Sequence, residues 1–160
     1  MSEFVPDNFD VPTTLITKKF LLRTLTANDA AKDYEAVITS LDHLKGIFGP
    51  NSIWPVVDLT LEENITSIDL HQKEFQKRSL FTYTVMNLGE SRCLGCVYIL
   101  PSDNEQYEAM VIMWVRKSEL ASGLDEELFS AVQDWIDKKW PFKKVAYPGR
   151  KITWDKFLND

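Results

Sequence analysis

Short strand patterns and longer helical patterns alternate along the chain. The first is a β-like run from Lys19 to Leu25. Thr26 and Asp29 follow it with the spacing of a capping box, and apolar residues then recur at helical spacing as far as Leu41. We therefore expect the chain to open with a strand and a helix.

A second capping box, at Thr60 and Glu63, marks the start of another helix. Its helical spacing continues to about Lys77. The segment between the two helices contains glycine and proline, which predicts a loop. The residues expected to form the apolar face of the second helix are Leu61, Ile65, Ile68, Gln72 and Phe75.

Three β-like runs come next and follow each other closely. They cover Leu80 to Asn87, Cys93 to Leu100 and Tyr107 to Val115. The short connection from Leu88 to Glu90 is typical of a hairpin between the first two runs. The third run is apolar on both faces, so we expect it to be a central strand.

The C-terminal part begins with a strongly amphipathic helical pattern from about Leu124 to Lys139. Pro141 ends that helix, and Lys144 to Tyr147 is a last short strand. An irregular tail is expected after this strand, held to the domain by its apolar residues. The stripe of the helix that we expect to be buried consists of Leu124, Leu128, Ala131, Val132 and Trp135.

The order of these elements predicts the fold class. The step from Tyr107–Val115 through the long helix to Lys144–Tyr147 is a βαβ unit, whose right-handed crossover should place the two strands parallel. Together with the hairpin, this unit predicts an α/β domain with a mixed central sheet and helices on both faces. The chain has 160 residues and no dividing linker, so we expect one domain over residues 1–160.

Composition narrows the class of protein. With 44% hydrophobic and 26% charged residues, the chain has enough apolar material for one core. No apolar run is long enough to span a bilayer, and the acidic N-terminus lacks the pattern of a signal peptide, so we expect no membrane contact and a cytoplasmic location. A net charge of −6 argues against nucleic acid as a partner.

The cysteines Cys93 and Cys96 have the C-x-x-C spacing of redox pairs and of half a zinc site. They fall in a β-like run, where residues three apart point to opposite faces. The histidines His43 and His71 lie upstream in segments expected to be helical surface, so a second pair of zinc ligands is missing. We expect two free thiols on opposite sides of one strand and no metal site.

The opening residues Leu22-Arg23-Thr24-Leu25-Thr26-Ala27-Asn28-Asp29-Ala30, with this order of elements, resemble the GNAT superfamily. Members commonly begin with a strand of the form L-R-x-L-T-x-x-D-A that leads into the first helix. The resemblance covers about residues 18–148. It implies an N-acyltransferase that uses acetyl-CoA or another acyl-CoA and acts on a small-molecule or protein amine, and it is compatible with a homodimer.

The resemblance also implies where the coenzyme would bind. In the family the pantetheine arm lies between two diverging strands, and the pyrophosphate lies on backbone amides at the start of the next helix, where an anion is generally favoured. The positions of this sequence that correspond to the arm are Trp114, Val115 and Arg116. Those that correspond to the pyrophosphate are Ser122, Gly123 and Leu124.

The expected phosphate loop departs from the family's pattern Q/R-x-x-G-x-G/A. Here the stretch is Leu120-Ala121-Ser122-Gly123-Leu124-Asp125, in which Gly123 matches, whereas Leu120 and Asp125 do not. Asp125 and the two glutamates after it favour the helix dipole but repel a phosphate. The alternative interpretation is a well-capped helix that binds no phosphate.

The resemblance also suggests an acid for the reaction, because many relatives use a tyrosine in a helix after the fifth strand. Here Pro148-Gly149-Arg150 follows the last predicted strand, and the family's fourth-helix pattern is absent. Tyr147 ends the last predicted strand and is the candidate acid, and Glu108 is the candidate base. The alternative for Glu108 is a solvated carboxylate at a strand end. Six basic residues near the end of the long helix and beyond would either hold the 3′-phosphate of the coenzyme or be solvated: Lys138, Lys139, Lys143, Lys144, Arg150 and Lys151.

Two functions of different classes follow from this pattern. The first is an acyl-CoA-dependent N-acyltransferase acting on an amine. The second is a GNAT-fold module without catalysis that binds a small ligand or a protein, which the departures at Leu120 and Asp125 favour. Binding of coenzyme A between the two diverging strands would distinguish the enzyme from the module.

Overall fold

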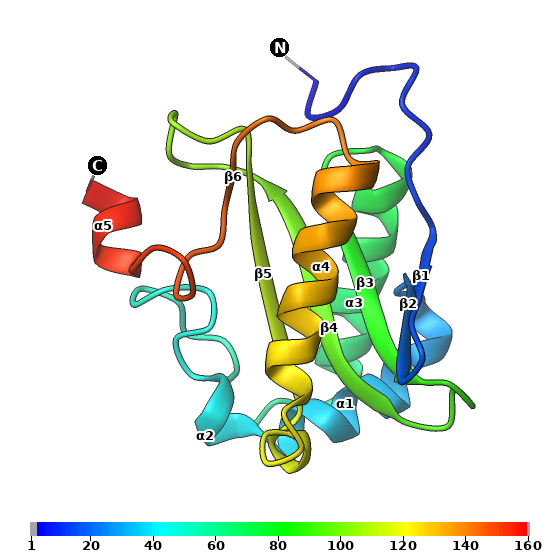
Figure 1. Cartoon of the computed structure of the whole chain (residues 1–160). Coiled ribbons are helices and arrows are strands. Elements are labelled where there is room, and N and C mark those ends of the chain that lie inside the picture. The colour runs from blue at the N-terminus through cyan, green and yellow to red at the C-terminus, as the bar shows by residue number, and fades with distance from the viewer. Residues whose placement is uncertain (1–2, 160) are drawn as a thin grey trace.

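Residues 3–159, which the computed structural model describes, contain a six-stranded mixed sheet whose strands lie side by side in chain order (Figure 1). Neighbouring strands are antiparallel, except that the last two are parallel. The strands are β1 (Thr14–Ile16), β2 (Phe20–Thr24), β3 (Phe81–Asn87), β4 (Cys93–Pro101), β5 (Ala109–Val115) and β6 (Val145–Ala146).

Helices cover both faces of the sheet, as the element order predicted (Figure 1). The long helix α4 (Leu124–Lys139) crosses one face, and α1 (Ala30–Ile38) and α3 (Leu61–Gln76) lie on the other. The shorter helices are η1 (Ala27–Asp29), α2 (Leu41–Leu44), η2 (Lys117–Glu119) and α5 (Trp154–Asn159). None of the described helices is long and apolar enough to cross a membrane.

The central strands are buried on both sides, because successive side chains alternate between two hydrophobic clusters. On β5, Val111, Met113 and Val115 belong to the cluster beneath α4, whereas Ile112 and Trp114 belong to the cluster beneath α1 and α3. This two-sided burial explains why the sequence of β5 is apolar throughout. The prediction of a central strand is confirmed.

The parallel pairing of β5 with β6 is also confirmed. Ala109 lies opposite Val145, and Met110 lies opposite Ala146. The connection between the two strands runs through α4, whose expected apolar stripe is turned to the sheet. Within that stripe Trp135 is 5% exposed and meets Tyr83 edge-on, with ring centroids 5.1 Å apart.

Both predicted capping boxes are present. The Glu63 N–H donates to Thr60 Oγ1 at 3.1 Å, and the Thr60 N–H donates to Glu63 Oε1 at 3.0 Å. At the first helix, the Thr26 N–H donates to Asp29 Oδ2 at 2.9 Å. Because Asp29 also binds both terminal nitrogens of Arg23, at 2.8 and 2.7 Å, this cap joins β2 to the helix that follows.

Two ends of the chain are more ordered than the sequence pattern suggested. Thr14–Ile16 pairs with β2 as the edge strand β1, although its three residues carry too short a pattern to indicate a strand. The tail after β6 is not irregular but ends in α5, whose Phe157 is 2% exposed. Burial of this aromatic side chain explains why the tail folds back onto the domain.

The expected apolar face of α3 was partly wrong. Leu61 and Ile65 are 39% and 40% exposed, whereas Asn64 and Ile68 are buried. Asn64 donates a hydrogen bond to the buried Asp33 of α1 at 3.0 Å. A polar contact therefore occupies the position on this face that an apolar pattern would assign to leucine or isoleucine.

The two thiols are free, as predicted, but the prediction that they face opposite sides of the strand was wrong. Both belong to the cluster beneath α1 and α3. The register shifts between Val85, which lies opposite Gly95, and Met86, which lies opposite Cys93. This β-bulge adds one residue between Cys93 and Cys96, so both side chains return to the same face.

Gly95, beside that bulge, is required by a close approach of two backbones. A Cβ atom at this position would lie 2.1 Å from the carbonyl oxygen of Trp114 on β5. No side chain fits at such a distance, so glycine allows β4 and β5 to come together at the bulge.

Candidate functional site

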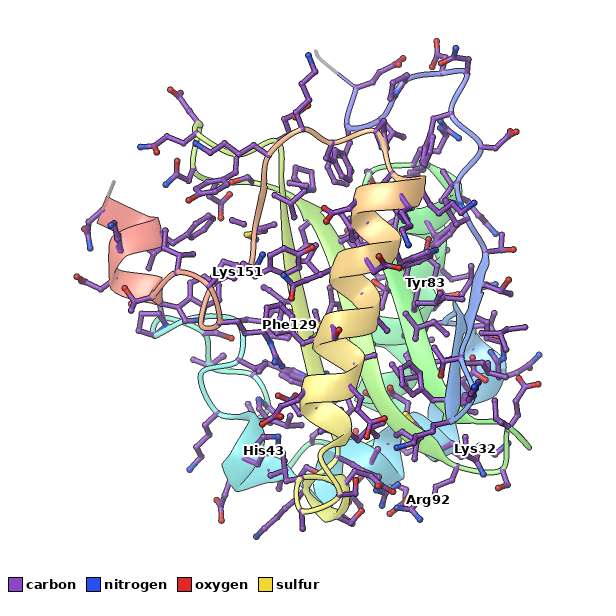
Figure 2. The ribbon with its side chains drawn as sticks, viewed as in Figure 1. Lys32, His43, Tyr83, Arg92, Phe129 and Lys151 are labelled. Carbon is purple, nitrogen blue, oxygen red and sulfur yellow. The ribbon has the colours of Figure 1, made fainter. Side chains whose placement is uncertain are left out.

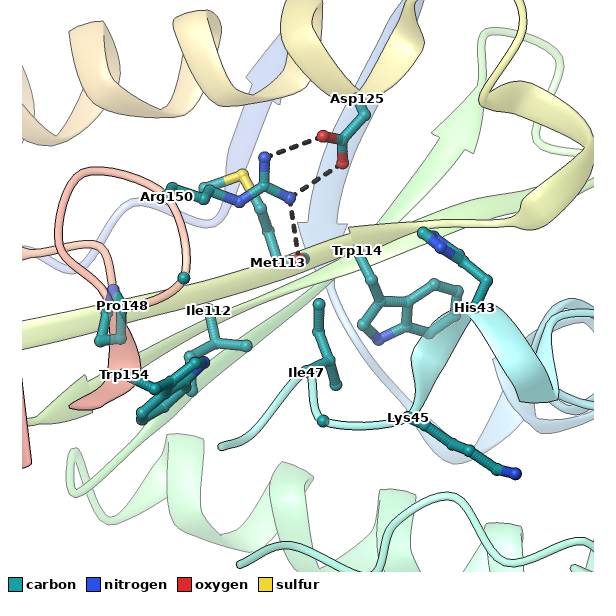
Figure 3. Close-up of a pocket in the computed structure, with 12 residues that line it drawn as sticks. His43, Lys45, Ile47, Ile112, Met113, Trp114, Asp125, Pro148, Arg150 and Trp154 are labelled. Atoms are coloured by element: carbon teal, nitrogen blue, oxygen red, sulfur yellow. Dashed lines mark hydrogen bonds and ion pairs between the residues drawn. The ribbon is translucent and has the colours of Figure 1, made fainter. Parts of the chain in front are cut away.

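A groove opens along β5 where β6 leaves it. The two strands pair only at Ala109–Val145 and Met110–Ala146, while β5 continues to Val115. The groove has a volume of about 360 Å³, and its walls come from the segment after α1, from β5, from the first turn of α4 and from residues 148–154 (Figure 3). It is thus bounded by an open strand edge and by a helix N-terminus.

The guanidinium group of Arg150 lies inside this groove (Figure 3). Its Nη1 donates to Asp125 Oδ2 at 2.9 Å, and its Nη2 donates to Asp125 Oδ1 at 2.8 Å. The same Nη2 donates to the carbonyl oxygen of Met113 at 3.2 Å. The Phe129 ring of α4, labelled in Figure 2, also lies under the guanidinium, 5.1 Å from its central carbon. Arg150 therefore connects the start of α4 to the open edge of β5.

His43 meets a second carbonyl group of the same strand. Its Nε2 lies 3.1 Å from the carbonyl oxygen of Val115, and its ring lines the groove. The expectation that His43 is a surface residue of a helix was therefore wrong, because the short helix α2 turns its side chain toward the end of β5 (Figure 3). Two carbonyl groups of β5, those of Met113 and Val115, thus meet side chains of this chain.

The predicted phosphate loop is a tightly turned segment. Gly123 has a φ of 81°, in the left-handed region, and a Cβ atom there would meet no atom within 4 Å. The N–H groups of Ser122 and Gly123 donate to the carbonyl oxygens of Glu119 and Leu120, each at 3.3 Å. Since these two amides are bonded within their own turn, an anion at this end of α4 would have to be met by the amides that follow.

The acidic first turn of α4 is partly neutralised. Asp125 is paired with Arg150, and Glu127 lies 3.1 Å from Lys19 Nζ in an exposed ion pair. The repulsion of a phosphate that the sequence suggested is therefore offset at Asp125 by a cation from residues 148–154. Glu126, between them, is exposed to solvent.

The three residues predicted to lie along the pantetheine arm have different surroundings. Trp114 is 1% exposed, lines the groove, and donates from its indole nitrogen to the Tyr98 hydroxyl at 3.1 Å. Val115 is fully buried. The Arg116 side chain binds Glu35 of α1, with nitrogen–oxygen distances of 2.7 and 2.5 Å, and its cation lowers the pKa of that carboxyl group. Arg116 therefore joins the end of β5 to α1.

The candidate acid and base lie on the order of 10 Å apart, at about 3.3 Å per residue, because the Glu108 N–H donates to the carbonyl oxygen of Lys144, three residues before Tyr147. Tyr147 packs against Phe129 of α4 with ring centroids 5.4 Å apart, and burial raises the pKa of its hydroxyl group, with a smaller effect of Asp137. Glu108 lies at the other end of β5, about 20 Å from Trp114 at about 3.3 Å per residue. Its Oε1 accepts the N–H groups of Lys143 and Lys144, at 2.5 and 3.2 Å, so it orients the turn before β6.

The six basic residues do not gather into one patch. Lys138 pairs with Asp134 on the surface of α4 at 3.0 Å. Lys144 and Lys151 lie over aromatic rings, 5.2 and 5.5 Å from the centroids of Tyr107 and Tyr147, whereas Arg150 points into the groove. The alternative of a solvated cation is therefore wrong for Arg150, whose side chain is 17% exposed. A contact between Asp125 and an arginine 25 positions later has no local sequence pattern that would indicate it.

No family model and no curated protein sequence matches the chain, whereas its structure matches solved acetyltransferases. A ribosomal-protein-S5-alanine acetyltransferase from Vibrio fischeri superposes with a TM-score of 0.67 at 15% identity, over 92% of this chain and 80% of that one. The protein has the fold of the GNAT acetyltransferases. The resemblance of the opening residues and element order is thereby confirmed at the level of fold.

Two further solved acetyltransferases are similar to this chain in structure. An acetyltransferase from Salmonella typhimurium, which modifies the N-terminal serine of ribosomal protein L7/L12, has a TM-score of 0.65 at 10% identity, over 82% of this chain and 72% of that one. The microcin C7 self-immunity acetyltransferase MccE, in complex with acetyl-CoA and AMP, has a TM-score of 0.58 at 13% identity, over 79% and 68%.

Proposed function

We propose that this protein is an acyl-CoA-dependent N-acyltransferase that acts on an amine. The observation that carries the proposal is the groove at the divergence of β5 and β6, which ends at the N-terminus of α4. An open strand edge offers backbone groups to an extended arm, and a helix N-terminus offers amide groups to a phosphate. Both features lie in one groove on a GNAT fold.

Of the residues proposed to hold the coenzyme, Trp114 lines the groove, and the others are its neighbours along the chain or belong to the turn that leads into α4. The arm would lie along Trp114, Val115 and Arg116, and the pyrophosphate near Ser122, Gly123 and Leu124, where the amides from Leu124 onward would meet it because those of Ser122 and Gly123 are bonded within the turn. Bound acyl-CoA supplies the activated acyl group, and the protein has to orient it toward the amine. For an arm to reach the Met113 carbonyl, Arg150 has to withdraw from that oxygen, which it can do while keeping its pair with Asp125.

Tyr147 stays the proposed acid because it directly precedes Pro148, which lines the groove; burial raises the pKa of its hydroxyl group and so makes it a weaker acid. Glu108 stays the proposed base by sequence position only, since it lies at the far end of β5 from the groove. The amine acceptor is either a small molecule or a protein N-terminus. Support for this class comes from the solved acetyltransferases with the same fold, which modify ribosomal proteins.

Calorimetry with acetyl-CoA tests the proposal, followed by mass spectrometry of a panel of amines and peptides incubated with protein and acetyl-CoA. We expect a micromolar dissociation constant and a mass increase of one acetyl group on at least one amine. Free adenosine bisphosphate should bind more weakly, because it lacks the arm that would follow β5. The absence of binding at about 1 mM acetyl-CoA, a free energy weaker than about −4 kcal/mol, would refute the enzyme.

The second candidate is a GNAT-fold module that binds a ligand or protein without catalysis. It is favoured by one observation, the contact of Arg150 with both Asp125 and the Met113 carbonyl, which fills the part of the groove that the arm would need. The two candidates differ in the calorimetric result. A protein that is folded but does not bind acetyl-CoA, coenzyme A or adenosine bisphosphate would support the module.

A further inference from the structure

A second cavity lies between α1, α3 and β4, on the other side of an aromatic layer from the groove. Its volume is about 170 Å³, which is below the usual range for drug-sized ligands and suits a small head group. Its lining includes the polar side chains of Asp33, Asn64, Ser67 and His71, the aromatic side chains of Phe48, Trp54 and Tyr98, and the aliphatic side chains of Leu25 and Ile68.

The carboxylate of Asp33 is the most unusual group of this cavity. The residue is 6% exposed, and its Oδ2 accepts a hydrogen bond from Asn64 Nδ2 at 3.0 Å. Within residues 3–159, no lysine, arginine or histidine nitrogen lies within the 4.0 Å of an ion pair with it. Burial raises the pKa of this carboxyl group to about 6, with Asp29 adding to the effect. A carboxylate buried in this way lowers stability unless a cation compensates its charge.

His71 does not provide that cation at neutral pH. Its side chain is 24% exposed rather than on the surface as the sequence suggested, and burial is the largest effect that lowers the pKa of its imidazole. Its Nδ1 lies 3.2 Å from Glu74 Oε1. In the neutral ring, a proton on Nδ1 satisfies Glu74 and leaves the Nε2 lone pair as a further acceptor. The polar groups of Asp33 and His71 are therefore suited to a donor.

The aromatic side chains complete an environment that favours positive charge. The Phe48 and Tyr98 rings meet edge to face with centroids 4.8 Å apart, and Phe48 and Trp54 do so at 5.3 Å. The His71 ring meets Tyr98 at 5.8 Å. Faces of tryptophan, tyrosine and phenylalanine attract cations, most strongly when the cation is removed from water.

We propose that this cavity binds a small organic cation, an alkylammonium group, with Asp33 as its counter-ion and Phe48, Trp54 and Tyr98 around it. The ammonium hydrogens or methyl groups contact the rings, and the carboxylate compensates the charge. Binding of the cation does not require acyl transfer, but its role as the acceptor amine rests on the proposed function. Trp114 lines the groove and donates to the Tyr98 hydroxyl, so one aromatic layer separates this cavity from the groove.

The test is calorimetry with choline and butylammonium, compared with 3,3-dimethylbutan-1-ol, a neutral molecule of the shape of choline. We expect the cations to bind at least about tenfold more tightly than the neutral alcohol. Asp33→Asn keeps the size of the side chain and an oxygen that can accept from Asn64, and it should weaken cation binding at least about tenfold. Asp69→Asn, on the exposed surface of α3, is the matched control and should change the affinity less than about twofold.

Equal affinity for choline and the neutral alcohol would overturn the proposal, as would unchanged cation binding by Asp33→Asn. Failure of the unaltered protein to bind either cation at about 10 mM would also overturn it. Circular dichroism of each variant is the control for folding. Titration of the same samples with acetyl-CoA distinguishes the two proposals, because cation binding without acetyl-CoA binding supports this cavity and refutes the enzyme.

Discussion

Arg150 and Asp125, which are 25 positions apart, form a bidentate ion pair inside the groove beside β5. The pair neutralises the charge of the carboxylate nearest to the expected pyrophosphate. Arg150 also donates a hydrogen bond to the carbonyl oxygen of Met113. Binding of a coenzyme therefore depends on two opposing effects of one contact. The cation favours phosphate, whereas its position on β5 competes with the arm.

Removal of the negative charge at Asp125 should tighten acetyl-CoA binding. Asp125→Asn keeps an acceptor for Arg150 and leaves its cation free to attract the phosphates, so we expect about tenfold tighter binding at low ionic strength, or about 1.4 kcal/mol. The gain should shrink as salt is added, because screening weakens the attraction. Glu126→Gln, in the same helical turn but exposed, is the control and should change the affinity less than about twofold. Calorimetry at two salt concentrations measures both variants, and an equal effect of the two would contradict the role of the pair.

Gly95→Ala should destabilise the protein strongly. A Cβ atom would lie 2.1 Å from the Trp114 carbonyl oxygen, so β4 and β5 must separate at the bulge. We expect a loss of about 3 kcal/mol or more in the free energy of unfolding, measured by urea denaturation. Gly89→Ala is the matched control, because a Cβ atom there meets nothing within 4 Å, and it should change stability by less than about 1 kcal/mol. Similar losses of unfolding free energy in both variants would contradict the close approach of the Gly95 and Trp114 backbones.

Trp135→Ala should destabilise the core beneath α4. The indole is 5% exposed and meets Tyr83 and Trp140, with ring centroids 5.1 and 5.6 Å apart. Truncation of such a side chain leaves a cavity, so we expect a loss of about 3–5 kcal/mol in denaturant titration. Lys139→Ala, on the exposed side of the same helix, should change stability by less than about 0.5 kcal/mol. A loss below about 1 kcal/mol for Trp135→Ala would contradict the packing of α4.

Asp33→Asn should stabilise the protein at neutral pH and lose this benefit in acid. The pKa of Asp33 is raised from its ordinary 3.8 to about 6, so between these values the folded state holds a proton that the unfolded state has released. The contribution of Asp33 to stability therefore falls as pH rises from about 4 to 6, and stays low above this range. We expect the free energy of unfolding of Asp33→Asn to exceed that of the unaltered protein by on the order of 2–3 kcal/mol at pH 7.5 and by little at pH 4. This follows from about 1.4 kcal/mol per pH unit between the two pKa values.

Urea denaturation at both pH values measures this gain. The exposed Asp42→Asn is the control, and its small effect should not depend on pH in the same way. A gain for Asp33→Asn that is equal at pH 7.5 and pH 4 would show that the native carboxyl group has an ordinary pKa.

The thiols should react only when the protein unfolds. Burial raises the pKa of Cys93 to about 12 and that of Cys96 well above its usual range, so neither forms the reactive thiolate at pH 8. We expect iodoacetamide to label neither cysteine of the native protein within minutes and both in concentrated urea, as measured by mass spectrometry. Rapid labelling without urea, or an intramolecular disulfide, would contradict the buried positions on β4.

Local patterns of the sequence were enough to predict most of the fold. The boundaries of α4 at Leu124 and Lys139 follow from helical spacing and from Pro141, and the capping box at Thr60 and Glu63 marks the start of α3. The parallel pairing of β5 with β6 follows from the handedness of a βαβ unit. Each of these features depends on residues that are close in sequence or on a general rule of chain topology.

The tertiary structure decided the features that depend on a single insertion or a distant partner. The bulge beside Gly95 reverses the alternation of β4 and brings Cys93 and Cys96 to one face, which a strict period of two does not predict. Likewise, Asn64 lies on the buried face of α3, where an apolar residue would be expected, because it donates a hydrogen bond to the buried Asp33. A hydrogen bond between two helices leaves no periodic pattern in either one.

The sequence by itself determined that the chain forms an α/β domain. It also determined that a glycine and an acidic first helical turn follow a central strand. Only the tertiary structure decided that Arg150 enters the groove and that His43 reaches Val115. The physical reason is that a site is formed by side chains from several elements, whose separations depend on how those elements pack. Hydrophobic spacing specifies the elements, but the polar contacts between them are specified by position in space.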